Sequence, residues 1–278
     1  MTRNTATTAL ATLATILLLT AAPAARAAGP VNVKLNAGTA GAGTVGAAVV
    51  GSSTDTWNRY TGSNSGGTVN LVDASNASSG LTATYTATNS YNGNAAQGAT
   101  PDDNLFKRYA YNLTQTLSNS NSVVIGGLTP GQSYDLYLYP GYDTRAGQTN
   151  VAAANTRVSQ FAVVGAATTG PLYVTNPGGT TTAAPTSPAS TYQSSFGAPA
   201  DTSAAAAGTT SNYGNYLLVS GVTPSDTDQI TIQFAAFAHG TASEGDFAGF
   251  QIVAVPEPAS LGLFALGALV AVTRRRRA

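Results

Sequence analysis

Residues 122–139 read SVVIGGLTPGQSYDLYLY, and residues 217–234 read LLVSGVTPSDTDQITIQF. Each stretch is a short apolar run, a glycine-containing corner closed by Thr-Pro, and a second run in which apolar and polar residues alternate. Alternation with a period of two is typical of a strand with one buried face, and the proline presets its backbone angle for a turn. The repeat therefore predicts two equivalent corners of one antiparallel β-sandwich.

The remainder of residues 28–255 favours the same fold class. Short runs rich in Val, Ile, Thr and Tyr alternate with clusters of Gly, Asn, Ser and Pro, without a convincing amphipathic helix. We predict a single all-β domain, an antiparallel β-sandwich. Residues 176–212 contain few apolar side chains, so we expect a long loop or a disordered linker inserted in that domain. The predicted strands are Val31–Asn36, Val45–Val50, Thr68–Val72, Leu81–Thr88, Tyr109–Leu117, Val123–Ile125, Ser133–Tyr139, Arg157–Val164, Leu172–Thr175, Tyr216–Ser220, Gln229–Phe237 and Phe247–Val255.

The composition excludes several classes of function. The 278 residues include one His and no Cys, and charged residues make up only 9% of the chain, against about 25% in a typical domain. Without cysteine, the chain has no disulfide, thiol nucleophile, thiolate metal site or iron–sulfur cluster. Residues 28–255 hold six basic and eleven acidic side chains, so we expect no nucleic-acid partner. We also expect no cofactor.

Residues 1–27 have the three parts of a secretory signal peptide. Arg3 supplies a positive start, residues 9–22 form an apolar run, and Ala25-Arg26-Ala27 offers a small-x-small cleavage pattern. The alternative is a permanent membrane helix, but spanning usually needs about 20 apolar residues. We therefore expect export by the general route.

The last 23 residues also have three parts. Residues 255–260 read VPEPAS, residues 261–272 are apolar, and four arginines follow, Arg274, Arg275, Arg276 and Arg277. Residues 259–273 would form a helix of about 22 Å, shorter than a hydrocarbon core of about 30 Å. The arginines would stay on the cytoplasmic side by the positive-inside rule. Pro256, Glu257 and Pro258 cannot continue the helix upstream, so we expect them in an extended segment.

This order of parts resembles the PEP-CTERM sorting signal of Gram-negative bacteria. The resemblance implies that a membrane-embedded exosortase cleaves near Pro256-Glu257-Pro258 and passes the protein onward. It also implies transient anchoring in the inner membrane, followed by delivery to the cell surface or the extracellular matrix. The alternative is a plain C-terminal tail anchor.

A second resemblance concerns the body. The segment Gly127-Leu-Thr-Pro-Gly, followed by Tyr134-Asp-Leu-Tyr-Leu-Tyr, looks like corners in galactose-binding-like jelly-roll domains. Residues 245–253, GDFAGFQIV, are similar to their closing strand. The resemblance implies a jelly-roll-like β-sandwich.

The sequence offers little for catalysis. His239 is the only imidazole, and no Gly-x-Ser-x-Gly elbow is present. The carboxylate pairs Asp102/Asp103, Asp226/Asp228 and Glu244/Asp246 lie in turn-like segments, where Asp ordinarily caps backbone amides. Such loops suit calcium better than they suit glycoside hydrolysis, but no Asp-x-Asp-x-Asp-Gly loop occurs. We therefore expect no enzyme and no metal site.

Aromatic side chains give the candidate binding residues. Trp57 is the sole indole, and it lies in the polar segment Asp55-Thr-Trp-Asn-Arg-Tyr. Alternation in residues 134–139 places Tyr137 and Tyr139 on the face opposite Tyr134. A flat ring beside polar donors suits sugars, so Trp57, Tyr137, Tyr139 and the nearby Tyr142 are candidates for glycan binding. The alternative is that Trp57 fills the core and the tyrosines cover a sheet.

These observations lead to three functional hypotheses. The first is an exported protein with a structural or adhesive role, sorted to the surface or matrix and associated with exopolysaccharide. The second is a non-catalytic carbohydrate-binding module. The third, a glycan-active enzyme, depends on a carboxylate spacing that the sequence does not reveal.

Overall fold

The computed structural model describes residues 29–35, 48–60, 65–92, 105, 108–141, 158–175, 216–237 and 245–256. These residues form fourteen β-strands, and within them no helix is long and apolar enough to cross a membrane. The strands are β1 (Val31–Lys34), β2 (Trp57–Arg59), β3 (Ser65–Val72), β4 (Ser78–Thr86), β5 (Asn89–Asn92), β6 (Arg108–Asn112), β7 (Ser122–Gly126), β8 (Tyr134–Tyr139), β9 (Val158–Val164), β10 (Thr168–Thr175), β11 (Leu217–Val222), β12 (Ile230–Phe237), β13 (Gly245–Phe247) and β14 (Gly249–Ala254).

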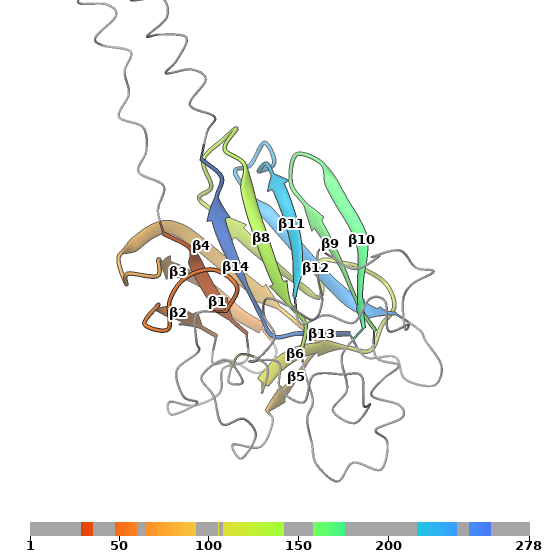
Figure 1. The fold of residues 1–278 in the computed structure, drawn as a ribbon. Coiled ribbons are helices and arrows are strands. Elements are labelled where there is room, and N and C mark those ends of the chain that lie inside the picture. The colour runs from red at the N-terminus through yellow and green to blue at the C-terminus, as the bar shows by residue number, and fades with distance from the viewer. Residues whose placement is uncertain are drawn as a thin grey trace, which may run out of the picture.

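The strands form two large sheets and one small one (Figure 1). The five-stranded sheet has the order β11-β8-β14-β1-β2, and the six-stranded sheet has the order β10-β9-β12-β7-β4-β3. Strands β13, β6 and β5 form the third sheet. All the described ladders are antiparallel except β1–β2. The predicted all-β fold is therefore confirmed.

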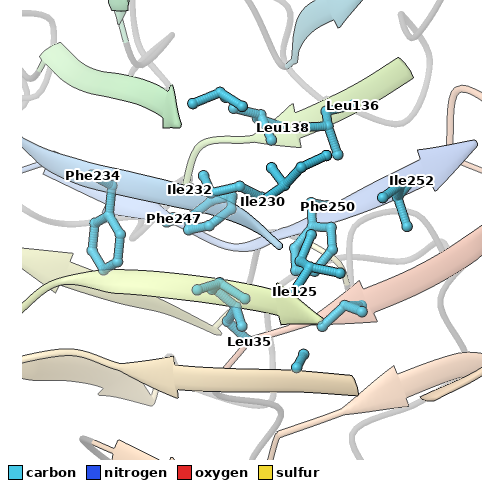
Figure 2. Packing of buried hydrophobic residues seen from close by; sticks show 14 of the residues in the cluster. Leu35, Ile125, Leu136, Leu138, Ile230, Ile232, Phe234, Phe247, Phe250 and Ile252 are labelled. Carbon is cyan, nitrogen blue, oxygen red and sulfur yellow. The ribbon is translucent and has the colours of Figure 1, made fainter. Parts of the chain in front are cut away.

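The core lies between the inner faces of the two large sheets. The five-stranded sheet contributes Leu136, Leu138 and Phe250, and the six-stranded sheet contributes Ile125 and Ile232, all fully buried in one cluster (Figure 2). In β8 the burial alternates as the sequence predicts, with Tyr134, Leu136 and Leu138 facing this core. Close packing of such side chains is the main stabilising contribution in a domain without disulfides.

The repeated corners have equivalent roles. The segment after β7 leads from the six-stranded to the five-stranded sheet, and the segment after β11 leads back. The two corners are in contact, because the amide of Leu128 donates to the carbonyl of Asp228 at 3.2 Å. Gly127 has a φ of 76°, and a Cβ there would lie 2.5 Å from the carbonyl oxygen of Gly80, so the first corner requires glycine.

Several strand predictions were wrong in detail. Residues 49–51 form a bend, where the sequence predicted a strand that ends at Val50. Residues 57–59 and 89–92 form the short strands β2 and β5, which were not predicted because their polar composition is typical of loops. The predicted strand Phe247–Val255 is divided at Ala248 into β13 and β14, which belong to different sheets.

Some predictions fall outside the described residues. They are the signal peptide at 1–27, the loop at 176–212, and the sorting segment after Pro256 with its short helix.

Candidate functional site

The sorting segment follows the last strand of the sandwich without a spacer. Strand β14 ends at Ala254, and the backbone of Val255 is still held: its amide donates to the carbonyl of Ser133 at 2.9 Å. The side-chain Nε2 of Gln132 donates to the carbonyl of Val255 at 2.5 Å and to that of Ser133 at 2.9 Å. Pro256 is the first exposed residue beyond these bonds. We call Gln132, Ser133 and Val255 the terminal clamp.

The two ends of the sandwich domain leave it side by side. Strand β1 pairs antiparallel with β14, and Val31 lies opposite Ile252. Because antiparallel neighbours run in opposite directions, β1 begins at the end of the sandwich where β14 finishes (Figure 1). Of the predicted sorting residues, Pro256 lies at this end, whereas Glu257, Pro258, Arg274, Arg275, Arg276 and Arg277 lie outside the described residues.

Two candidate glycan-binding rings are buried on the outer face of the five-stranded sheet. Trp57 is 7% exposed and Tyr139 is fully buried, and their ring centroids lie 6.4 Å apart. Both belong to a second cluster with Leu105, Tyr109 and Ala248. This placement differs from the exposed platform that stacking on a sugar requires, because neighbouring side chains cover the rings. It corresponds to the alternative in which Trp57 fills a core.

Tyr137 has a different environment. It is partly exposed, and its ring centroid lies 6.3 Å from that of Tyr216. Burial of the hydroxyl, and then the nearby Asp135 carboxylate and Tyr216, raise the pKa of Tyr137 above its usual value. The phenol is therefore neutral at physiological pH, in a residue that is partly accessible to solvent. Tyr142 lies outside the described residues.

A buried polar network joins the outer face to the segment that covers it. Gln251 Nε2 donates to Asn32 Oδ1 at 2.8 Å and to the carbonyl of Val50 at 2.6 Å. Its Oε1 accepts from the Tyr139 hydroxyl at 2.5 Å and from the amide of Val50 at 3.2 Å. The sequence analysis missed this network, although single amides within apolar strands, as in Val31-Asn32-Val33, were a usable signal.

Lys34 is a second polar residue that the sequence analysis missed. It is 1% exposed on β1, and its Nζ donates to the carbonyl of Leu105 at 2.7 Å. Lysine is almost never fully buried without partners. Its position at the end of β1 links that strand to a segment 71 residues further along the chain.

The described carboxylates are not grouped as a metal-binding site. Asp226 and Asp228 lie in the turn between β11 and β12, as predicted. Asp246 was predicted in a turn, but it is fully buried in β13, where its amide donates to the Ser159 hydroxyl at 2.7 Å. Within the described part of the chain, no three His, Asp or Glu side chains are grouped so as to hold a metal ion. His239, Asp102, Asp103 and Glu244 lie outside it.

Comparison with known families identifies one segment of the chain. Residues 254–277 match a PEP-CTERM protein-sorting motif, so the match begins at the last residue of β14. No curated protein and no solved structure matches the chain. The motif implies that the chain is exported and passes through a membrane-anchored stage before its release at the surface, and the described part of its exported body is all-β. More specifically, it carries the signal for processing by an exosortase-type enzyme.

Proposed function

We propose that the sandwich is a non-catalytic structural or adhesive component of the extracellular matrix that contacts exopolysaccharide. The observation that carries this proposal is the sorting motif, which starts at the last residue of β14. The whole described domain thus lies on the exported side of the signal, and it is the cargo that the signal delivers.

The surface of the six-stranded sheet supports a contact with polysaccharide. None of its six strands contains a Lys, Arg, Asp or Glu residue. Thr84 lies opposite Val124, which in turn lies opposite Thr231, so hydroxyls recur across the outer face. Thr68 continues this row, and its hydroxyl lies 2.7 Å from that of Thr84. An uncharged face with recurrent hydroxyls can exchange hydrogen bonds with sugar hydroxyls at a low desolvation cost.

The alternative is a carbohydrate-binding module on the opposite, five-stranded sheet. The observation that favours it is the partly exposed pair Tyr137 and Tyr216 on the outer face of that sheet. Aromatic rings with an accessible face are typical of sugar sites, but Trp57 and Tyr139 are buried beside this pair. The alternative site is therefore smaller than the sequence predicted.

Two measurements test the proposal. Fractionation of the native host, followed by mass spectrometry of the mature C-terminus, should recover a surface form without Arg274 to Arg277. Glu257→Ala should prevent this processing and retain the protein in the inner membrane. A surface form that keeps the arginines, or an unchanged destination for Glu257→Ala, would contradict the exosortase route.

Polysaccharide pull-down separates the two surfaces. The double variant Thr84→Lys/Thr231→Lys places charge on the hydroxyl face and should weaken retention by the host exopolysaccharide. The matched control is Thr227→Lys, in the exposed turn between β11 and β12. Loss of retention with Tyr137→Ala alone would instead favour the binding module. Turnover of released glycans would contradict a non-catalytic role.

A further inference from the structure

The terminal clamp holds the residue that immediately precedes the sorting tripeptide. The last backbone bond of the sandwich, from Val255 to Ser133, lies one residue before Pro256. An extended chain advances about 3.3 Å per residue, so the tripeptide starts within a few ångströms of the folded domain. An enzyme that binds residues upstream of Pro256 must therefore take Val255 from the terminal clamp and the residues before it from β14.

Strand β14 is held unequally at this end. On one side its ladder with β1 stops at the pair Val31 and Ile252, and the preceding residue of that chain is Pro30, which has no N–H to donate. On the other side, the ladder with β8 continues through Ala254 opposite Tyr134. Residues 253–255 are therefore held by β8 and by the clamp, so the end of β14 can open without disturbing β1.

Gln132 is positioned by its own loop independently of β14. Its amide donates to the carbonyl of Thr129 at 3.2 Å, and the amide of Thr129 donates to the hydroxyl of Tyr134 at 3.0 Å. Gly131 adopts a φ of 76° within the same turn. The loop therefore has backbone hydrogen bonds that remain when the Gln132 side chain is removed. That removal takes away the local bond to the carbonyl of Ser133 and the bond to Val255, and only the second of these joins the loop to the end of the domain.

We propose that Gln132 is a positioning residue for exosortase processing: its bond to Val255 closes the end of β14 and limits access to the tripeptide. The inference rests on the proposed exosortase route. Processing breaks one backbone C–N bond near the tripeptide. The acyl carbon passes to water or to another acceptor nucleophile, whose proton goes to the new amino group of the released tail. The processing enzyme reaches this bond when the clamp opens.

The size of the effect follows from the clamp. Local opening has a free energy set by the few bonds that must break. Loss of the Gln132 bond to Val255, which is the side-chain bond that opening must break, raises the open population roughly two- to tenfold. If the enzyme acts on the open form, the processing rate rises by the same factor.

The experiment follows conversion of the full-length precursor to the processed form by pulse-chase in the native host. Gln132→Ala should be processed roughly two- to tenfold faster than the wild type. The matched control is Gln233→Ala, because the Gln233 amide donates to Asn119 Oδ1 at 2.8 Å on an exposed surface. Gln233→Ala should be processed at the wild-type rate.

A spacer variant gives an independent test. Gly-Ser-Gly-Ser inserted between Val255 and Pro256 moves the tripeptide up to about 13 Å from the clamp. The spacer variant should be processed faster than the wild type, and adding Gln132→Ala to it should have no further effect. The insertion lies beyond the last bond of the sandwich, so it tests access even if Gln132→Ala fails to fold.

Several outcomes would overturn the proposal. The first is an unchanged or slower processing rate for a Gln132→Ala variant whose resistance to protease shows that it is folded. The second is a wild-type processing rate for the spacer variant. The third is an equal effect of Gln132→Ala on the rate with and without the spacer. Glu257→Ala is run in parallel. If that variant is still processed, the exosortase route fails; if it is not processed but the clamp variants have no effect, only the role of Gln132 fails.

Discussion

Phe250 and Gln251 are consecutive residues of β14, both fully buried, and they point to opposite faces of the five-stranded sheet. Phe250 packs in the core between the two large sheets, beside Phe247 at a centroid distance of 6.3 Å. Gln251 lies on the outer face, where its amide is hydrogen-bonded to Asn32, Val50 and Tyr139. One face is stabilised by apolar packing and the other by a polar network.

The comparison shows what each kind of contact can specify. Apolar packing contributes in proportion to buried area and tolerates exchange between side chains of similar volume. The amide network instead selects one geometry, because each donor must meet its acceptor. The outer network thereby fixes which segment covers the sheet, namely residues 49 and 50. We expect the inner face to determine most of the stability and the outer face to determine the position of that segment.

The largest expected effect is on the inner face. Phe250→Ala should lower the free energy of unfolding by about 3–5 kcal/mol, because it removes apolar contacts and leaves a cavity in a fully buried site. Urea denaturation of the purified exported protein measures this change. The control is Val69→Ala on β3, where the side chain is 38% exposed and the change should stay within about 0.5 kcal/mol. Equal losses for the two variants would contradict the location of the core.

The next effect is on the outer face. Gln251→Leu keeps the approximate volume but leaves the buried Tyr139 hydroxyl and Asn32 Oδ1 without this partner. The free energy of unfolding should fall by about 2–4 kcal/mol. Amide exchange at Val49 and Val50 should rise more than exchange in β12. A variant as stable as the wild type, with unchanged exchange, would show that the network contributes nothing.

A smaller effect tests whether the network acts as a unit. Tyr139→Phe removes the hydroxyl that donates to Gln251 and accepts from the amide of Val49. The expected cost is about 1 kcal/mol. In a double-mutant cycle with Gln251→Leu, the two losses should fall short of additivity by at least about 0.5 kcal/mol. Additive losses would mean that the two side chains stabilise the face separately.

The fold could be predicted from the sequence where the pattern was local. The period of two in residues 134–139 correctly placed Tyr134, Leu136 and Leu138 on one face of the strand, and the structure shows that this face packs in the core. The repeated Thr-Pro corners correctly indicated equivalent connections between the sheets. Strands β2 and β5 were missed because they form through pairing with distant residues, as when Trp57 pairs with Asn32. Their own composition gives little strand propensity.

The candidate site could be predicted only in part. The sorting motif is written in consecutive residues, so the sequence alone indicated it. The environments of Trp57 and Tyr137 depend on which segments cover the sheet, and alternation assigns a face without saying whether that face is covered. The terminal clamp was not predicted, because Gln132 and Val255 are 123 residues apart and meet only in the folded sheet.

The smallest effect concerns a polar atom on the apolar face. The Tyr85 hydroxyl is buried in the inner core and has no hydrogen-bond partner among the described residues. Burial raises the pKa of Tyr85 above its usual value of 10.0, so above pH 10 the unfolded chain loses this proton while the folded chain keeps it. The stability linked to this group is therefore complete below pH 10 and is lost as the pH rises further.

Tyr85→Phe should change the free energy of unfolding by less than about 1 kcal/mol at pH 7. Urea denaturation from pH 9 to pH 11 should show that the variant loses less of its free energy of unfolding over this range than the wild type does. Some loss should remain, because burial also raises the pKa of Tyr60; an identical slope in the two proteins would mean that Tyr85 ionises as readily in the folded chain as in the unfolded one.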